Sequence, residues 1–165
     1  MSIDSENTDP ALDLIIAGPE GWRDGTVARL KPDKRFNATQ KIEADFNGVD
    51  LARITSAEVL VSTVDPKFAT PAIKLAIALQ KKIHGLAVVF VLPTMFREEL
   101  VAFEEYRPVW TLVSSDIAED PEKIAEAVWS ASRGMVWVDP VINRRLNEVR
   151  AVSQRRSIAV AGYEE

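Results

Sequence analysis

Short apolar runs alternate with helix-like segments along most of the chain. The clearest run is LAVVFVL, residues 86–92, which contains no polar residue. Runs without polar alternation are typical of strands that are buried on both faces of a parallel sheet. Similar runs lie at 12–18 (LDLIIAG), 57–63 (AEVLVST) and 109–115 (VWTLVSS). The alternation predicts an α/β fold, a doubly wound five-stranded parallel sheet flanked by helices.

The connecting segments predict helices and one further strand. The clearest helix spans 70–85, where Thr70 is a candidate cap, Pro71 suits the first turn and Gly85 ends the pattern. Helices are also predicted at 22–31, 48–56, 95–106 and 120–134. The remaining segment, 35–44, is predicted to be an edge strand because it holds few apolar residues.

The length of 165 residues suits one domain. We expect a flexible leader at 1–11, a single domain at 12–135, and an exit strand, a connector helix and a tail at 136–165. The connector helix carries Arg144, Arg145, Arg150, Arg155 and Arg156. The simplest interpretation of these arginines is one solvated face of the helix.

Composition excludes several classes of protein. The chain has no cysteine, which excludes disulfides and thiolate metal sites. It has no run near the roughly 20 apolar residues that a membrane span needs, and its acidic N-terminus does not resemble a signal peptide. A net charge of −5 gives the chain as a whole no general attraction to nucleic acid. We therefore expect a cytoplasmic protein without a membrane partner.

Two segments resemble a known family. DPEKIAEAVWSASRGMVWVDPVINRRL, residues 120–146, resembles the last helix and exit strand of receiver domains from NarL/FixJ-type response regulators. LDLIIAGPEGWRDGTVARL, residues 12–30, is similar to the family's opening strand and helix. The resemblance implies a receiver (flavodoxin-like) fold with an extra C-terminal helix. It also implies a homodimer, and DNA contact only through a downstream helix-turn-helix domain that is not visible in this chain.

The resemblance also allows the family's phosphorylation site to be compared residue by residue. Receivers use two acidic residues that bind Mg²⁺, an acceptor aspartate, a switch hydroxyl and a lysine; a hard cation needs such oxygen ligands. The matching positions here are Ala17, Gly18, Ser62, Leu92 and Ser114. All five depart from the family pattern, so the resemblance implies a receiver fold without receiver phosphorylation. No metal, cofactor or catalytic residue is predicted.

Two other groups of polar residues are candidates for a catalytic or metal site. A rearranged acidic pocket would use Glu20, Asp24 and Asp65, although exposed loop positions are the commoner fate of such residues. A nucleophilic triad would use Ser62 and His84, but these residues are predicted to lie at opposite ends of the helix at 70–85. The members of a triad must lie within hydrogen-bond reach of one another, which disfavours this reading.

Large apolar side chains gather in the region 95–110. A possible interaction surface comprises Phe96, Leu100, Phe103, Tyr106 and Trp110. An exposed apolar patch commonly marks a contact with another protein, whereas core packing would need no partner. The sequence leaves both interpretations open.

Three functional hypotheses follow. The first is a phosphorylation-independent, receiver-like regulatory module of a transcriptional response regulator, acting through dimerisation, protein contacts or an unknown ligand. The alternative is a freestanding pseudo-receiver that docks partner proteins without binding DNA. A distant third is a small-molecule enzyme that uses Ser62 or the loop acids.

Overall fold

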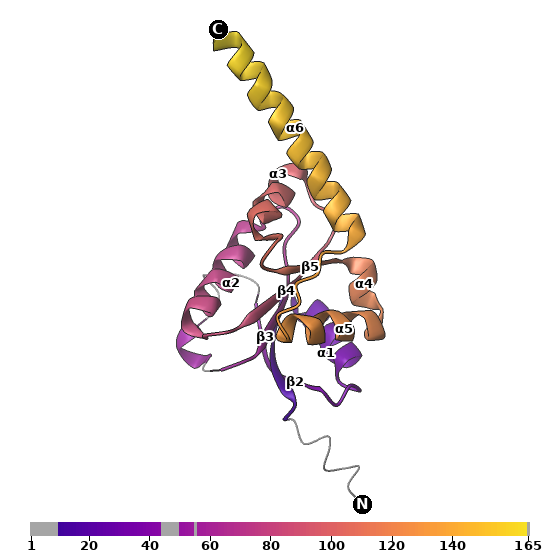
Figure 1. Cartoon of the computed structure of the whole chain (residues 1–165). Helices are drawn as coiled ribbons and strands as arrows, with labels where there is room; N and C mark the ends of the chain where they lie inside the picture. The colour runs from indigo at the N-terminus through magenta and orange to yellow at the C-terminus, as the bar shows by residue number, and fades with distance from the viewer. Residues whose placement is uncertain (1–9, 44–49, 55, 165) are drawn as a thin grey trace, which may run out of the picture.

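The protein is a layered α/β domain built on one parallel sheet (Figure 1). The computed structural model describes residues 10–43, 50–54 and 56–164, without the side chains of residue 39 and of 153–164. The sheet has five strands in the order β2-β1-β3-β4-β5, and all neighbouring strands run parallel. The strands are β1 (Leu12–Ala17), β2 (Phe36–Ile42), β3 (Val59–Thr63), β4 (Ala87–Leu92) and β5 (Thr111–Ser114). The predicted fold class is confirmed, including the edge position of β2.

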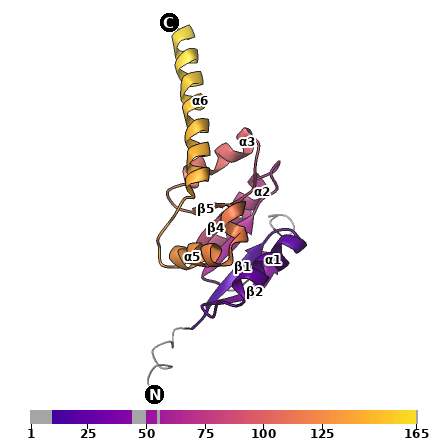
Figure 2. The same ribbon diagram turned by 90° about the vertical axis from the view of Figure 1, so that its right-hand side faces the viewer.

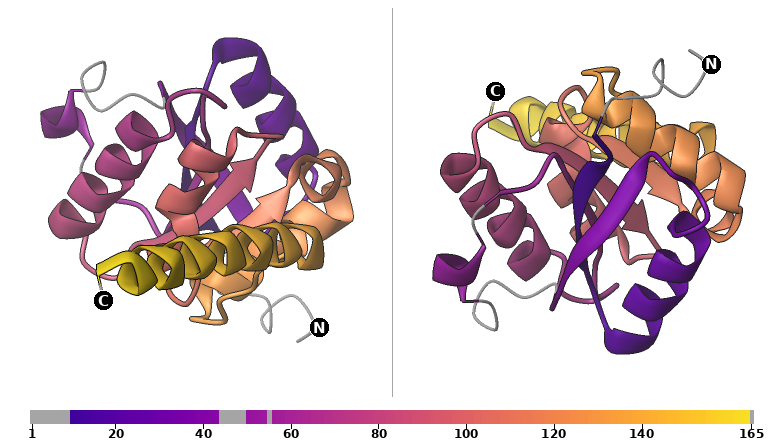
Figure 3. Two further views of the ribbon diagram at one scale, coloured as in Figure 1. Left: turned by 90° about the horizontal axis from the view of Figure 1, so that it is seen from above. Right: turned by 90° about the horizontal axis from the view of Figure 1, so that it is seen from below.

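Helices cover both faces of the sheet, as Figure 3 shows from two sides. One face carries α1 (Glu20–Leu30), α4 (Ser115–Glu119) and α5 (Pro121–Ser132). The other face carries α2 (Thr70–Lys82), the short α3 (Arg97–Leu100), the 3-10 helix η3 (Val101–Tyr106) and the first turns of α6 (Pro140–Glu164). A second 3-10 helix, η2 (Leu51–Arg53), precedes β3.

The double covering explains the uninterrupted apolar strands. In β1, Ile15 and Ala17 point into the core beneath α2, whereas Leu14 and Ile16 point into the core beneath α1 and α5. Successive side chains of a strand point to opposite faces, so both sets must be apolar. All four side chains are fully buried.

The structure corrects four details of the sequence-based expectation. Thr70 does not cap α2: the N-cap residue is Ala69, whose N–H donates to the Glu99 carboxylate at 2.7 Å. The helix predicted at 95–106 is divided into α3 and η3, and α4 was not predicted at all. The helix predicted at 48–56 is reduced to η2 within the described residues. Most of the predicted leader at 1–11, together with the side chains of Arg155 and Arg156, lies outside the described part.

The C-terminal helix α6 is much longer than the others, at 25 residues. Figure 2 shows it projecting from the domain beyond α3. Ile142, Leu146 and Val149 anchor its first turns in the core. No helix in the described ranges combines the length and apolar character needed to cross a membrane. The fold therefore presents a compact sheet domain with one helix extending from its carboxyl edge.

Candidate functional site

The strand ends bring four of the five compared positions to one edge of the sheet. Ala17 pairs with Ser62 across β1 and β3, and Leu92 pairs with Ser114 across β4 and β5. Gly18 directly follows β1. Ligands of open α/β sheets bind beyond such carboxyl ends, so this edge is the first place to look for a site. Here Ala17, Ser62 and Leu92 are at most 2% exposed.

Trp22 closes the edge above β1. A Cβ atom on Gly18 would lie 2.6 Å from Cε3 of Trp22 and 2.9 Å from Cγ2 of Thr63. Separations this short require the neighbouring atoms to move. A carboxylate at position 18, as a receiver metal site needs, would therefore require Trp22 and Thr63 to move. Trp22 was not singled out from the sequence, because its position over Gly18 depends on how α1 leaves β1.

The two hydroxyl groups at the end of β3 donate hydrogen bonds within the protein. Ser62 Oγ donates to the carbonyl oxygen of Thr63 at 2.9 Å, and Thr63 Oγ1 donates to the carbonyl oxygen of Val91 at 3.0 Å. Ser62 is 1% exposed, so a substrate cannot reach its hydroxyl without rearrangement. His84 is exposed just beyond the C-terminal end of α2, whereas Ser62 lies in β3, which precedes the N-terminal end of that helix. The structure thus does not assemble the Ser62–His84 triad.

The three acidic residues Glu20, Asp24 and Asp65 do not share a contact with one another. Asp65 accepts a hydrogen bond from the Lys67 N–H at 2.8 Å, as in a local turn. Asp24 forms an exposed ion pair with Lys41 at 3.5 Å, and Glu20 is exposed at the start of α1. No group of three metal-type ligands occurs in the part of the chain that the structure describes. The rearranged acidic pocket is not formed by these residues.

Asp139 is a buried polar residue near the carboxyl ends of the strands that the sequence did not single out. It is 3% exposed, and one carboxylate oxygen accepts a hydrogen bond from the Ser114 N–H at 3.0 Å. The other oxygen accepts from the Val141 N–H at 2.9 Å, which caps α6. Burial acts to raise the pKa of Asp139, but the hydrogen bonds from Ser114 and Val141 outweigh it and the pKa is lowered. A buried carboxylate therefore joins the end of β5 to the start of α6.

Two arginines also fasten α6 to the domain. Arg107, which follows η3, donates from Nη1 to the side-chain oxygens of Asn143 and Asn147 at 3.0 and 2.6 Å. Its other terminal nitrogen donates to Glu104 at 2.5 Å. On α6 itself, Arg145 donates to the carbonyl oxygen of Met95 in the loop after β4 at 3.1 Å. Hydrogen bonds thus connect α6 to η3 and to the loop after β4.

Most of the large apolar side chains singled out at 95–110 belong to the hydrophobic core. Of the two interpretations left open by the sequence, core packing holds for Leu100, Phe103 and Trp110, which are at most 2% exposed. The rings of Phe103 and Trp110 lie 5.1 and 5.2 Å from Phe90 of β4. Tyr106 is half-buried and stacks on Trp110 at 4.0 Å. Phe103 and Trp110 thus cover the face of β4 that carries Phe90.

Phe96 is the exception in this set. It is 61% exposed, just before α3, and Val101 nearby is 41% exposed. Of the predicted interaction residues, only Phe96 presents a large apolar surface to solvent. It remains a candidate contact residue.

Substituting aspartate at Gly18 tests whether Trp22 closes the edge. Gly18→Asp is expected to destabilise the domain by about 1–3 kcal/mol, because the new side chain collides with Trp22 and Thr63. Combining it with Trp22→Ala should remove much of the added penalty, measured as a coupling energy in a chemical-denaturation cycle. Gly21→Asp is a matched control, since nothing lies within 4 Å of a Cβ there. Additive effects of Gly18→Asp and Trp22→Ala would contradict this account.

Comparison with known proteins supports the fold only. No protein-family model matches the sequence, and no curated protein matches it. Among solved structures, the response regulator ChrA of a heme-sensing two-component system superposes with a TM-score of 0.66 at 16% identity, covering 85% of this chain and 66% of that one. The chain therefore spans slightly less than two thirds of ChrA.

Structures of RcsB also match, and two of them illustrate the similarity. Its isolated receiver domain from Salmonella enterica serovar Typhimurium, determined with the phosphomimetic BeF3−, has a TM-score of 0.61 at 16% identity, with 82% of this chain and 99% of that one covered. A structure of two RcsB dimers on two parallel DNAs has a TM-score of 0.64 at 17% identity, covering 83% and 68%. This protein therefore has the fold of a response-regulator receiver domain.

Proposed function

We propose that the protein is a phosphorylation-independent, receiver-like regulatory module of a transcriptional response regulator. The observation that supports this most directly is the closed edge, where Trp22 occupies the space beside Gly18 and Ser62 is buried. The fold supports a regulatory module, and the replaced side chains at Ala17 and Leu92 support an input other than phosphate.

The proposed output element is α6. Asp139, Arg107 and Arg145 connect it to the ends of β5 and β4 and to η3. A regulatory input must have different affinity for two states of the protein. An input that shifts the loop after β4, or that breaks the Asp139 contacts, would change how α6 is held. In this proposal α6 transmits the change to a following segment or partner.

Assembly and DNA contact are part of the same proposal. The RcsB neighbours include dimers bound to DNA, which supports a homodimer here by analogy of fold. DNA contact is proposed only through a helix-turn-helix domain downstream of residue 165, in a cytoplasmic regulator. Light scattering on the purified protein at increasing concentration would show a dimeric mass if the proposal is right.

The alternative is a freestanding pseudo-receiver that docks partner proteins without DNA. It shares the same closed edge, and the exposed Phe96 favours it as a docking residue. The enzyme hypothesis has less support, because the Ser62 hydroxyl is buried and donates to a backbone carbonyl. The reading frame after residue 165 distinguishes the first two hypotheses.

The proposal predicts no phosphorylation. After incubation with acetyl phosphate and Mg²⁺, the intact mass is expected to stay unchanged, because neither a metal-binding carboxylate pair nor an acceptor aspartate stands at the strand ends. Ser62→Asp should remain unmodified too, since the metal ligands are still missing. A receiver domain with all of these acidic residues is the positive control. A hydroxylamine-sensitive adduct, on Asp65 for example, would refute the proposal.

A further inference from the structure

A cavity lies at the amino ends of the strands, on the side of the sheet opposite Ser62 and Ser114. It measures about 650 Å³. It is lined by Pro10, Leu12, Lys34, Arg35, Trp129, Ser132 and Arg133. Leu12 begins β1 and Arg35 precedes β2, whereas Ser132 and Arg133 end α5, which runs back along the sheet. The cavity therefore lies at the amino ends of the strands, away from Trp22 and Ser62.

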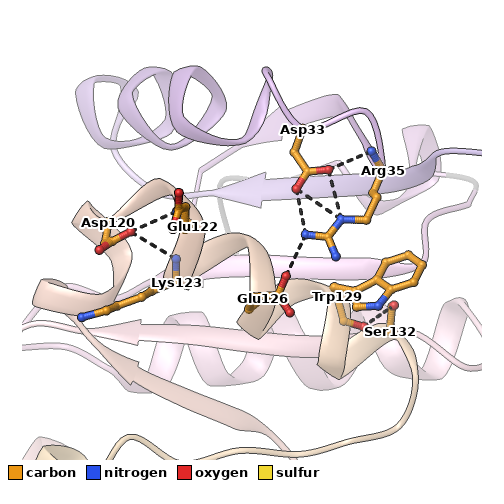
Figure 4. A network of polar contacts seen from close by, with 8 residues as sticks. All are labelled: Asp33, Arg35, Asp120, Glu122, Lys123, Glu126, Trp129 and Ser132. Carbon is orange, nitrogen blue, oxygen red and sulfur yellow. Dashed lines mark hydrogen bonds and ion pairs between the residues drawn. The ribbon is translucent and has the colours of Figure 1, made fainter.

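One wall of the cavity is a fixed cationic and aromatic group. The Arg35 guanidinium lies 5.0 Å from the Trp129 ring, and that of Arg133 lies 4.5 Å from the same ring. Figure 4 shows Arg35 between Asp33 and Glu126, with Trp129 beside it; the two ion pairs measure 2.8 and 3.1 Å. Stacking on an aromatic ring restricts a guanidinium group and leaves its N–H edge available.

The charges of this wall are only partly balanced. Arg35 forms ion pairs with both Asp33 and Glu126, and the hydrogen bond from Arg35 lowers the pKa of Asp33. Among the described residues, neither Lys34 nor Arg133 forms an ion pair with a carboxylate. Lys34, Arg35 and Arg133 together with Asp33 and Glu126 leave one net positive charge at this wall, in a protein whose net charge is −5.

We propose that this cavity binds a small organic anion that combines a phosphate or carboxylate group with a flat apolar body, of the size of a nucleoside monophosphate. Cavities of roughly 300–1,000 Å³ are typical of small-molecule sites, and this volume lies within that range. Arg133 and Lys34 bind the anionic group, because guanidinium and ammonium groups are the usual partners of phosphate and carboxylate. Pro10, Leu12 and Trp129 contact the apolar body. A concave site with a few cations suits a small ligand better than a nucleic-acid strand, which needs a basic groove along its backbone.

Adenosine monophosphate is the test probe, with inorganic phosphate as the comparator. Titration at low salt, followed by amide chemical shifts, should give saturable changes at Leu12, Arg35 and Trp129. Phosphate alone should bind at least about tenfold more weakly, since it lacks the apolar body. Arg133→Gln, and separately Lys34→Gln, should each weaken binding by about tenfold, and both residues are exposed enough for the variants to fold. Lys74→Gln, an exposed lysine on α2, is the matched control and should bind as the wild type does.

Several outcomes would overturn the assignment. These are the absence of saturable binding, equal affinity for phosphate and adenosine monophosphate, or unchanged affinity in both cavity variants. Tighter binding of a short single-stranded oligonucleotide, with a salt dependence that reports several phosphate contacts, would assign the surface to nucleic acid instead. Binding can be measured whether or not the chain is phosphorylated or dimeric, so this test is independent of the proposed regulatory role.

Discussion

Replacing Asp139 with alanine is expected to destabilise the protein by about 2–4 kcal/mol and to loosen the start of α6. The substitution removes a helix cap and a buried carboxylate, and it leaves the Ser114 and Val141 N–H groups without their acceptor. Chemical denaturation measures the stability loss. Hydrogen exchange in the first turns of α6 measures the loosening.

Asp120→Ala is the matched control for this experiment. Asp120 caps α5 in the same way, accepting from the N–H groups of Glu122 and Lys123 at 3.0 and 3.3 Å, and a proline follows it as one follows Asp139. It is less buried and does not bridge to a strand, so its loss should cost only about 1 kcal/mol. Equal losses at Asp120 and Asp139 would mean that Asp139 acts as an ordinary cap and does not join β5 to α6.

The stabilisation by Asp139 also depends on pH. Because the pKa of Asp139 in the folded protein lies below the ordinary value for an aspartate, the carboxylate contributes its full stabilisation above that ordinary value. The contribution is lost as the pH falls through the folded-state pKa. The stability difference between wild type and Asp139→Ala should therefore be constant near neutral pH and shrink in acid below 3.8. A difference that persists unchanged in strong acid would contradict the role of the ionised carboxylate.

The sheet was predictable because burial on both faces imposes one simple requirement on the strands. β1, β3 and β4 must be apolar at nearly every position, and such runs are visible without any knowledge of the partner elements. The edge strand β2 was also predicted, because an edge position tolerates the polar residues of 35–44. Helix divisions were less predictable: α3 and η3 lie in one apolar segment, and η3 packs against α6, which is distant in the sequence.

The sequence predicts which residues lie at the strand ends, but it does not predict which side chains surround them. Counting along the chain placed Ser62 and Ser114 at strand ends, and the pairing of the strands brings them to one edge. The closing side chain, Trp22, belongs to a helix whose orientation no local pattern reports. Asp139 carried a usable signal, since an aspartate followed by proline at a helix start is typical of an N-cap, as at Asp120. The pattern reports the cap alone, because the buried contact with Ser114 depends on where β5 ends relative to α6.

Replacing Trp110 with alanine is expected to have the largest effect on stability, a loss of about 3–5 kcal/mol. The side chain is 2% exposed, packs against Phe90 and Tyr106, and donates from Nε1 to the Gln80 side chain at 3.1 Å. Its removal leaves a cavity between β4, α2 and η3 that these elements cannot readily close. Urea denaturation of the variant measures the loss.

Phe96→Ala separates this core role from a contact role in the same segment. Because Phe96 is 61% exposed, its truncation should change stability by no more than about 0.5 kcal/mol. If Phe96 contributes to self-association, the same variant should shift the concentration at which a dimeric mass appears, while its unfolding curve stays near that of the wild type. Large destabilisation by Phe96→Ala, or none by Trp110→Ala, would reverse the division between core and surface. The two variants thus test directly which apolar side chains of 95–110 hold the domain together and which are available to a partner.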